Sequence, residues 1–135
     1  MDTNVLVYAY DVTDDRRHAT AQAVLRELWS WRTGVISTQV LQEFYVVATR
    51  KLAQPLSRAA ARDVVVDYST WPVVQVDPTL VLSASILEEE QTLSFWDALV
   101  VGAAQRAGAV RLLSEDLQDG RTIGTVVIED PFADL

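Results

Sequence analysis

One carboxylate stands at the start of an otherwise apolar stretch, Leu93–Ala104. Ser94 and Asp97 have the spacing of a helix capping box, which predicts a helix that begins here. Asp97 then has two explanations: a helix-end acid that contributes about 0.3–1 kcal/mol, or a metal ligand, since buried charges are paired or bind metal. The stripe expected to face the core is Trp96, Leu99, Val100 and Ala103.

Three further acids lie at element ends or in apolar stretches. Asp2 precedes the first apolar segment, Glu43 interrupts a helical stripe of Val, Phe and Tyr, and Asp116 follows a strand by three residues. Taken by itself, Asp116 can be explained as a turn or N-cap residue. Asp119, which precedes Gly120, can be explained as a turn residue. Together, Asp2, Glu43, Asp97 and Asp116 are expected to converge on one acidic pocket.

Such a pocket would bind Mg²⁺ or Mn²⁺, because hard divalent cations take oxygen ligands. Two ions about 3.5–4 Å apart could activate water and stabilise the leaving oxygen of a phosphodiester. Other kinds of catalytic site find little support in the sequence. There is no cysteine for thiolate chemistry, and His18 is the only histidine. We expect His18 at the surface and the four tryptophans mainly in the core.

Composition limits the class of protein. The 135 residues carry a net charge of −8 and are 50% hydrophobic, which predicts one domain over residues 1–135. The charge disfavours nucleic-acid binding unless clustered acids hold a cation that attracts phosphate. Since no apolar run approaches the ~18 residues of a membrane span and no signal peptide is recognisable, we expect a cytoplasmic protein without a membrane partner.

Helical patterns alternate with short apolar strands along the chain, which predicts an α/β layered domain with a mainly parallel sheet. Residues 2–10 fit either a strand or a short helix. Apolar residues in two of the helices, 39–52 and 57–68, predict a homodimer. The expected helices are 14–32 (ended by Gly34), 39–52, 57–68, 78–90 and 94–108, and the expected strands are 35–36, 73–76, 110–113 and 125–128.

Four short motifs in this order resemble those of PIN-domain ribonucleases, and among these the VapC-type toxins of prokaryotic toxin–antitoxin modules. The motifs are Asp2-Thr3-Asn4-Val5-Leu6, Gln42-Glu43-Phe44, Trp96-Asp97-Ala98-Leu99 and Leu113–Gly120. The resemblance covers essentially the whole chain.

The resemblance implies a three-layer PIN-like domain, with a mainly parallel central sheet flanked by helices, and a metal-dependent endoribonuclease. It also implies a homodimer and a cognate antitoxin that places a basic side chain among the acids, for which the negative charge is suitable. The implied metal ligands are Asp2, Glu43, Asp97 and Asp116, with Asp119 as an accessory acid and Thr3, Asn4 and Ser114 as orienting residues.

One departure concerns the start of the chain. Family members usually carry apolar residues before the first aspartate, which form the central strand, whereas only Met1 precedes Asp2 here. We expect either a shortened strand or a true start upstream. A missing strand would leave neighbouring backbone groups unpaired and would loosen the placement of Asp2.

Two other functions fit the residues less well. A Mg²⁺ phosphatase with Asp2 as nucleophile would want an aspartate at position 4, which is Asn4. A catalytically silent interaction module would leave the four acids without a purpose.

Overall fold

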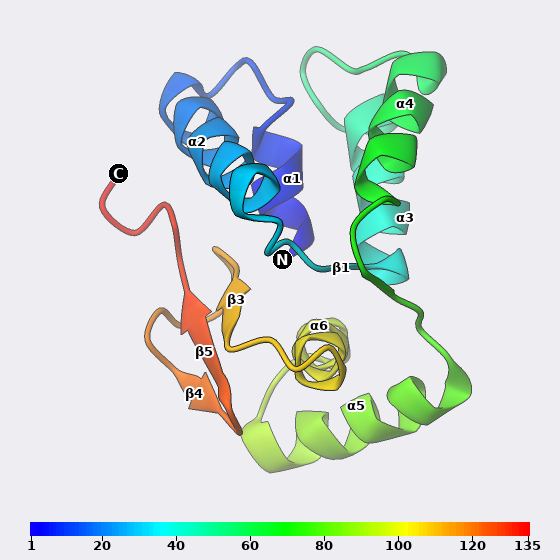
Figure 1. Cartoon of the computed structure of the whole chain (residues 1–135), viewed down its shortest axis with the longest axis vertical. Helices are drawn as coiled ribbons and strands as arrows, with labels where there is room; N and C mark the ends of the chain where they lie inside the picture. Colours follow the sequence, from blue (N-terminus) through cyan, green and yellow to red (C-terminus); the bar gives the residue numbers. More distant parts are fainter.

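The computed structural model describes residues 1–135, as six helices and five short strands (Figure 1). The helices are α1 (Thr3–Tyr8), α2 (Asp15–Trp31), α3 (Thr38–Arg50), α4 (Arg58–Tyr68), α5 (Pro78–Gln91) and α6 (Phe95–Arg106). The strands are β1 (Ile36–Ser37), β2 (Val73–Val74), β3 (Arg111–Leu113), β4 (Thr122–Ile123) and β5 (Val126–Glu129).

The strands form two separate sheets. β1 pairs in parallel with β2, and β5 lies between β3, which is parallel to it, and β4, which is antiparallel. The predicted parallel pairing is confirmed, but the expected central sheet is divided into a two-stranded and a three-stranded part. The hairpin of β4 and β5, which turns at Gly124 with φ of 62°, was not predicted.

Side-chain caps fix the helix starts, and the cap predicted at Ser94 is confirmed. Ser37, Ser57, Asp77 and Ser94 each accept a hydrogen bond from a backbone N–H in the first turn of the next helix. The ambiguous segment 2–10 is a helix, capped by Asp2.

The predicted end of α2 near residue 32 is confirmed, but the residue that ends the helix is different. Arg32, the C-cap, adopts the left-handed conformation with φ of 53°, a role that the sequence had assigned to Gly34. Gly34 is needed for a different reason, because a Cβ atom there would lie 2.5 Å from the Trp71 ring.

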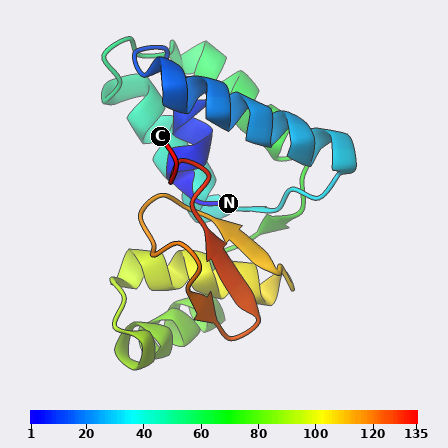
Figure 2. The same ribbon diagram turned by 90° about the vertical axis from the view of Figure 1, so that its left-hand side faces the viewer.

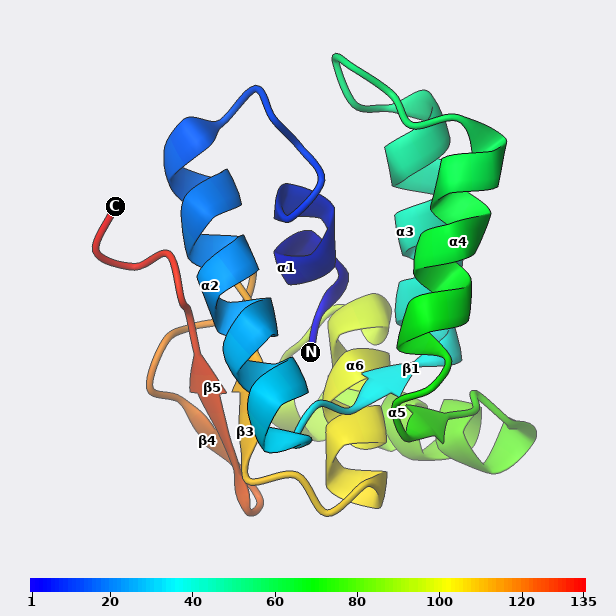
Figure 3. The same ribbon diagram turned by 45° about the horizontal axis from the view of Figure 1, so that its top comes forward.

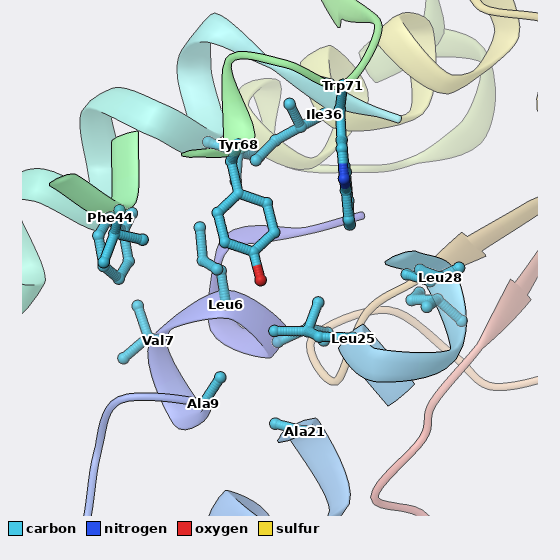
Figure 4. Packing of buried hydrophobic residues seen from close by; sticks show 14 of the residues in the cluster. Leu6, Val7, Ala9, Ala21, Leu25, Leu28, Ile36, Phe44, Tyr68 and Trp71 are labelled. Carbon is cyan, nitrogen blue, oxygen red and sulfur yellow. The ribbon is translucent and has the colours of Figure 1, made fainter. Parts of the chain in front are cut away.

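Helices enclose the strands in two groups (Figure 1). α1 to α4 lie on one side of the molecule, while α6 lies against β3 and β5 with α5 beneath it (Figure 2). The largest core cluster joins the first group, where Leu6 of α1, Leu25 of α2 and Tyr68 at the end of α4 meet (Figure 4).

Helix α6 is the most deeply buried element, with every residue from Ala98 to Ala104 in the interior. Its first turn is different. Trp96 was predicted to face the core with Leu99, Val100 and Ala103, but its side chain is 63% exposed, so this part of the prediction is wrong. Trp29 and Trp31 also reach the surface, so only Trp71 confirms the expectation that tryptophans fill the core. No helix has both the length and the apolar character of a membrane span.

Candidate acidic metal centre

Asp2 is buried where the first helix begins. Its Oδ1 accepts a 2.7 Å hydrogen bond from the Thr3 N–H, and its Oδ2 accepts a 2.6 Å bond from the Ser114 hydroxyl. The Asp2 N–H in turn donates to the Leu113 carbonyl oxygen at 2.9 Å. These bonds tie the start of α1 to the end of β3, and they fix the Asp2 carboxylate.

Glu43 is the second carboxylate that hydrogen bonds hold in place. The Thr3 hydroxyl donates to its Oε2 at 2.6 Å, and the Gln39 amide donates to its Oε1 at 2.9 Å. The Gln39 Nε2 also lies 3.3 Å from the Trp96 carbonyl oxygen, to which it donates. Residues of α1, α3 and α6 are thereby linked around one carboxylate.

Asp97 and Asp116 differ from the first pair, because no hydrogen bond holds either carboxylate. The Asp97 N–H donates to Ser94 Oγ at 3.1 Å, and the Asp116 N–H donates to Ser114 Oγ at 3.2 Å. In each case the backbone is anchored while the side-chain oxygens accept no formed hydrogen bond, although the Asn4 amide lies near the Asp116 carboxylate. Helix capping therefore uses the Asp97 backbone and leaves its carboxylate available.

The charges of the acids act on one another. Burial raises the pKa of Asp2 above its ordinary value, the charge of Asp116 adds to the rise, and the bonds from Ser114 and Thr3 oppose it. Partial enclosure likewise raises the pKa of the Asp116 carboxyl; the Asn4 amide opposes this, and the charges of Asp97 and Glu43 reinforce it. Asp116 is therefore near enough to Asp2, Asp97 and Glu43 for their charges to affect one another.

A second network surrounds the acid that precedes Asp116. Glu115 accepts a 2.6 Å bond from the Tyr8 hydroxyl and a 2.8 Å bond from Arg17 Nε. Its N–H lies 3.4 Å from Asn4 Oδ1, to which it donates. Because Arg17 is paired with Glu115 and Asp14, it does not neutralise the four acids.

The donor set fits a hard divalent cation. All four groups are carboxylates, none takes part in a salt bridge, and two have no hydrogen bond. No three of the acids stand at the spacing of a formed metal site. Coordination of one cation by three of these carboxylates would therefore require some side chains to rotate. Asp97 and Asp116 can do so, because their carboxylates are not held by hydrogen bonds. Two side-chain atoms nearby are buried without partners, Asn4 Nδ2 and Gln39 Oε1.

Most of the residues expected at the site lie together, from α1, α3, α6 and the loop after β3. Asp119 is turned away, since its Oδ1 accepts a 2.9 Å bond from the Asp130 N–H, and its accessory role stays a prediction. Gln39 was missed. Its position four residues before Glu43 on one helix face is the signal that could have identified it.

Residues 1–118 match the sequence profile of the PIN domain. The chain belongs to the PIN domain family. Among solved structures, the crystal structure of VapC20 from Mycobacterium tuberculosis, a sarcin–ricin loop cleaving toxin, resembles this PIN domain with a TM-score of 0.58 and 24% identity. The match covers 82% of this chain and 83% of VapC20. It confirms the fold expected from the motifs. No curated protein sequence matches the chain.

Proposed function

We propose that this PIN domain is a metal-dependent endoribonuclease of the toxin type. The observation that carries the proposal is the pair of carboxylates without hydrogen bonds, Asp97 and Asp116, beside the firmly held Asp2 and Glu43. A bound Mg²⁺ or Mn²⁺ would activate water and stabilise the leaving oxygen of an RNA phosphodiester.

The residues around the acids have separate tasks in this proposal. Ser114 and Thr3 fix the two inner carboxylates, and Gln39 links Glu43 to the first turn of α6. Asp97 and Asp116 complete the ligand set when a cation draws them in. The remaining coordination positions of such an ion suit water and substrate phosphate.

The proposed partners follow from charge and from the likeness to VapC20. With a net charge of −8, the chain would repel RNA except where a cation is bound, and it would attract a basic antitoxin segment. We propose RNA as the substrate, a cognate antitoxin as inhibitor, and the cytoplasm as the place of action.

The two alternatives make different demands on the structure. In a phosphatase with Asp2 as nucleophile, the residue at position 4 would act on substrate, but Asn4 Oδ1 instead accepts a bond from the Glu115 backbone. An interaction module would not need two carboxylates free of hydrogen bonds.

The test is Asp97→Asn, which keeps the size and the cap but removes one charge. We expect RNA cleavage to fall by orders of magnitude and the stabilisation by Mn²⁺ in a melting curve to decrease. Without metal, the melting temperature should stay level or rise, because repulsion is relieved. Asp63→Asn, an exposed change on α4, is the matched control.

Two results would contradict the metal nuclease. If the unaltered chain still cleaves RNA in EDTA, cleavage does not require a metal. If Asp97→Asn is as active as Asp63→Asn, Asp97 is not a ligand of a catalytic metal. If the unaltered chain binds Mn²⁺ but neither it nor the variants cleave RNA, the result would favour the interaction module.

We further propose a homodimer formed through apolar helix surface. Val66 on α4 is exposed, and Leu82 and Ile86 stand one helical turn apart on the exposed side of α5. Sedimentation at micromolar concentration should give twice the monomer mass. Comparison of Val66→Ser with Leu82→Ser would show which helix surface is used, and a clean monomer for the unaltered chain would refute the dimer.

A further inference from the structure

Positive charge is concentrated where α3 is followed by α4. Residues 50–62 hold four of the chain's 11 Lys and Arg residues and no Asp or Glu, although the net charge of the whole chain is −8. All four side chains are exposed. Like charges that lie together repel one another and attract ions of the opposite sign, so this surface suits an anionic partner. We call it the basic corner, and its members are Arg50, Lys51, Arg58 and Arg62.

The fold brings both ends of this segment together. α3 ends at Arg50 and α4 begins at Arg58, and the loop between them turns back so that the Leu56 N–H donates to the Ala48 carbonyl oxygen at 2.9 Å. Figure 3 shows the two helices side by side, joined at the end that lies away from α6. The four cations therefore share one corner of the molecule.

No acid of the chain neutralises the basic corner. The salt bridges of the molecule use only the cations Arg17, Arg106 and Arg111. The side chains of the basic corner are thus free to pair with an anion from outside, and no ion pair within the chain has to break first.

The electrostatics of the two helices explain only half of the basic corner. Arg50 and Lys51 lie at the C-terminal end of α3, where cations interact favourably with the helix dipole. Arg58 is the first residue of α4 and Arg62 follows one turn later, at the end where the dipole favours anions instead. No acid stands in the first turn of α4. Arg58 and Arg62 are therefore placed against the local preference, which indicates a role other than helix stability.

Helix α3 connects the basic corner with the acidic centre. Glu43 lies near the start of the helix and Arg50 at its end. The two residues are two turns apart and return to the same side of the helix, at a distance of about 10 Å along its axis. A nucleic-acid strand that has one phosphate at the acidic centre can therefore bring neighbouring phosphates to the basic corner.

We propose that the basic corner binds the sugar–phosphate backbone of the RNA substrate next to the cleavage site. The inference rests on the proposed function, in which a cation at the acidic centre holds the phosphate that is cleaved. The guanidinium groups of Arg50, Arg58 and Arg62 can each donate two parallel hydrogen bonds to phosphate oxygens. Contacts of this kind fix the position of a strand without reading its bases.

The proposal explains how so acidic a chain can hold RNA. The molecule as a whole repels phosphate, and a cation at the acidic centre reverses this repulsion at one place. The basic corner reverses it at a second place, at the other end of α3. An acidic protein segment would carry the same sign of charge as RNA, but only a strand with regularly spaced phosphates engages both places at once.

The experiment measures the affinity for a 2′-O-methyl RNA of about ten nucleotides in Mg²⁺ over a range of KCl concentrations. Arg58→Gln removes one cation of the basic corner, and Arg26→Gln, at an exposed position on α2, is the matched control. We expect Arg58→Gln to lower the affinity about fivefold at about 0.1 M KCl and to reduce the slope of log affinity against log salt by about 0.7, the value for one phosphate contact in a single strand. Arg50→Gln should behave alike, Arg58→Lys should keep most of the slope, and Arg26→Gln should keep all of it.

Two results would overturn the proposal. Salt slopes for Arg58→Gln and Arg50→Gln that equal the slope for Arg26→Gln would mean that no phosphate contacts the basic corner. A poly-glutamate peptide of the same charge as the RNA could bind the unaltered chain more tightly than the RNA does and lose affinity in Arg58→Gln. The occupant would then be an acidic protein segment.

RNA cleavage separates this inference from the proposed function. If the unaltered chain cleaves RNA and Asp97→Asn does not, but Arg58→Gln leaves the salt slope unchanged, only the basic corner is refuted. If Arg58→Gln lowers the salt slope while no chain cleaves RNA, the nuclease is refuted and the basic corner is confirmed as an RNA contact.

Discussion

Ser114 joins two of the acids through one oxygen atom. Its side chain is fully buried, its hydroxyl donates to Asp2 Oδ2, and the same Oγ accepts from the Asp116 N–H. A single hydroxyl thus orients the carboxylate that begins α1 and the backbone that carries Asp116.

We expect Ser114→Ala to lower the free energy of unfolding by about 1–3 kcal/mol, because it leaves buried polar groups without partners. It should also reduce the rise in melting temperature caused by Mn²⁺. Urea unfolding and melting curves measure both. Ser69→Ala, which removes an exposed bond to the Val65 carbonyl oxygen, should change neither by a comparable amount.

Trp96 lies next to Asp97, and most of its ring is in solvent. Single-stranded RNA binds proteins by stacking bases on such rings, at about 1–3 kcal/mol per base. We expect Trp96→Ala to weaken RNA affinity about tenfold and Trp96→Phe to weaken it less. Trp31→Ala, at the exposed end of α2, is the control, and an equal loss from both changes would contradict a stacking role for Trp96.

The sequence pointed to the four acids and, through the family resemblance, to Thr3 and Ser114 as residues that orient them, but it did not point to Gln39. Asp2, Glu43, Asp97 and Asp116 stand out because charge is unusual at element ends within apolar stretches. Gln39 is an ordinary polar residue by composition, and its importance depends on where Trp96 lies in space. Trp96 was assigned to the core because helical spacing cannot show that the first turn of α6 projects from the packed region.

At the scale of elements, helices were predictable and strands less so. A cap such as Ser94 acts within a few residues, so the sequence shows it. Strands of two to four residues owe their existence to neighbours far along the chain. The division of the strands into two sheets likewise depends on contacts between distant segments, which no local pattern records.

One ion pair connects the last two helices. Arg106 of α6 donates to both carboxylate oxygens of Asp77, the N-cap of α5, at 2.8 and 3.0 Å. The Arg106 guanidinium and the bond from the Leu80 N–H keep the pKa of Asp77 below its ordinary value of 3.8. Since the folded-state pKa is the lower one, this contribution to stability is complete above the unfolded value and declines as pH falls through the folded value.

Asp77→Asn tests this linkage, because asparagine retains the cap but carries no charge. We expect the variant to melt below the unaltered chain at pH 7, and the difference to shrink progressively as the pH falls below about 4. Melting curves across that range measure it. A difference that is constant with pH would mean that the Asp77 charge does not contribute.

At the scale of the whole molecule, negative charge restricts what can approach. The net charge of −8 opposes RNA, whose binding to most proteins relies on Lys and Arg contacts to phosphate. If the acidic centre holds a cation, the local potential there is reversed. RNA binding should therefore depend on divalent metal more than on ionic strength.

We expect RNA affinity, measured by fluorescence anisotropy with an oligonucleotide that carries 2′-O-methyl groups to prevent cleavage, to fall at least about tenfold when EDTA replaces Mg²⁺ at constant ionic strength. Asp116→Asn should remove most of this metal dependence, because it takes away a carboxylate that no protein donor holds. Asp63→Asn changes the net charge by the same amount on α4 and should preserve the dependence. RNA affinity that is equal in EDTA and Mg²⁺ would mean that the RNA reaches this acidic protein through contacts other than a metal at the four carboxylates.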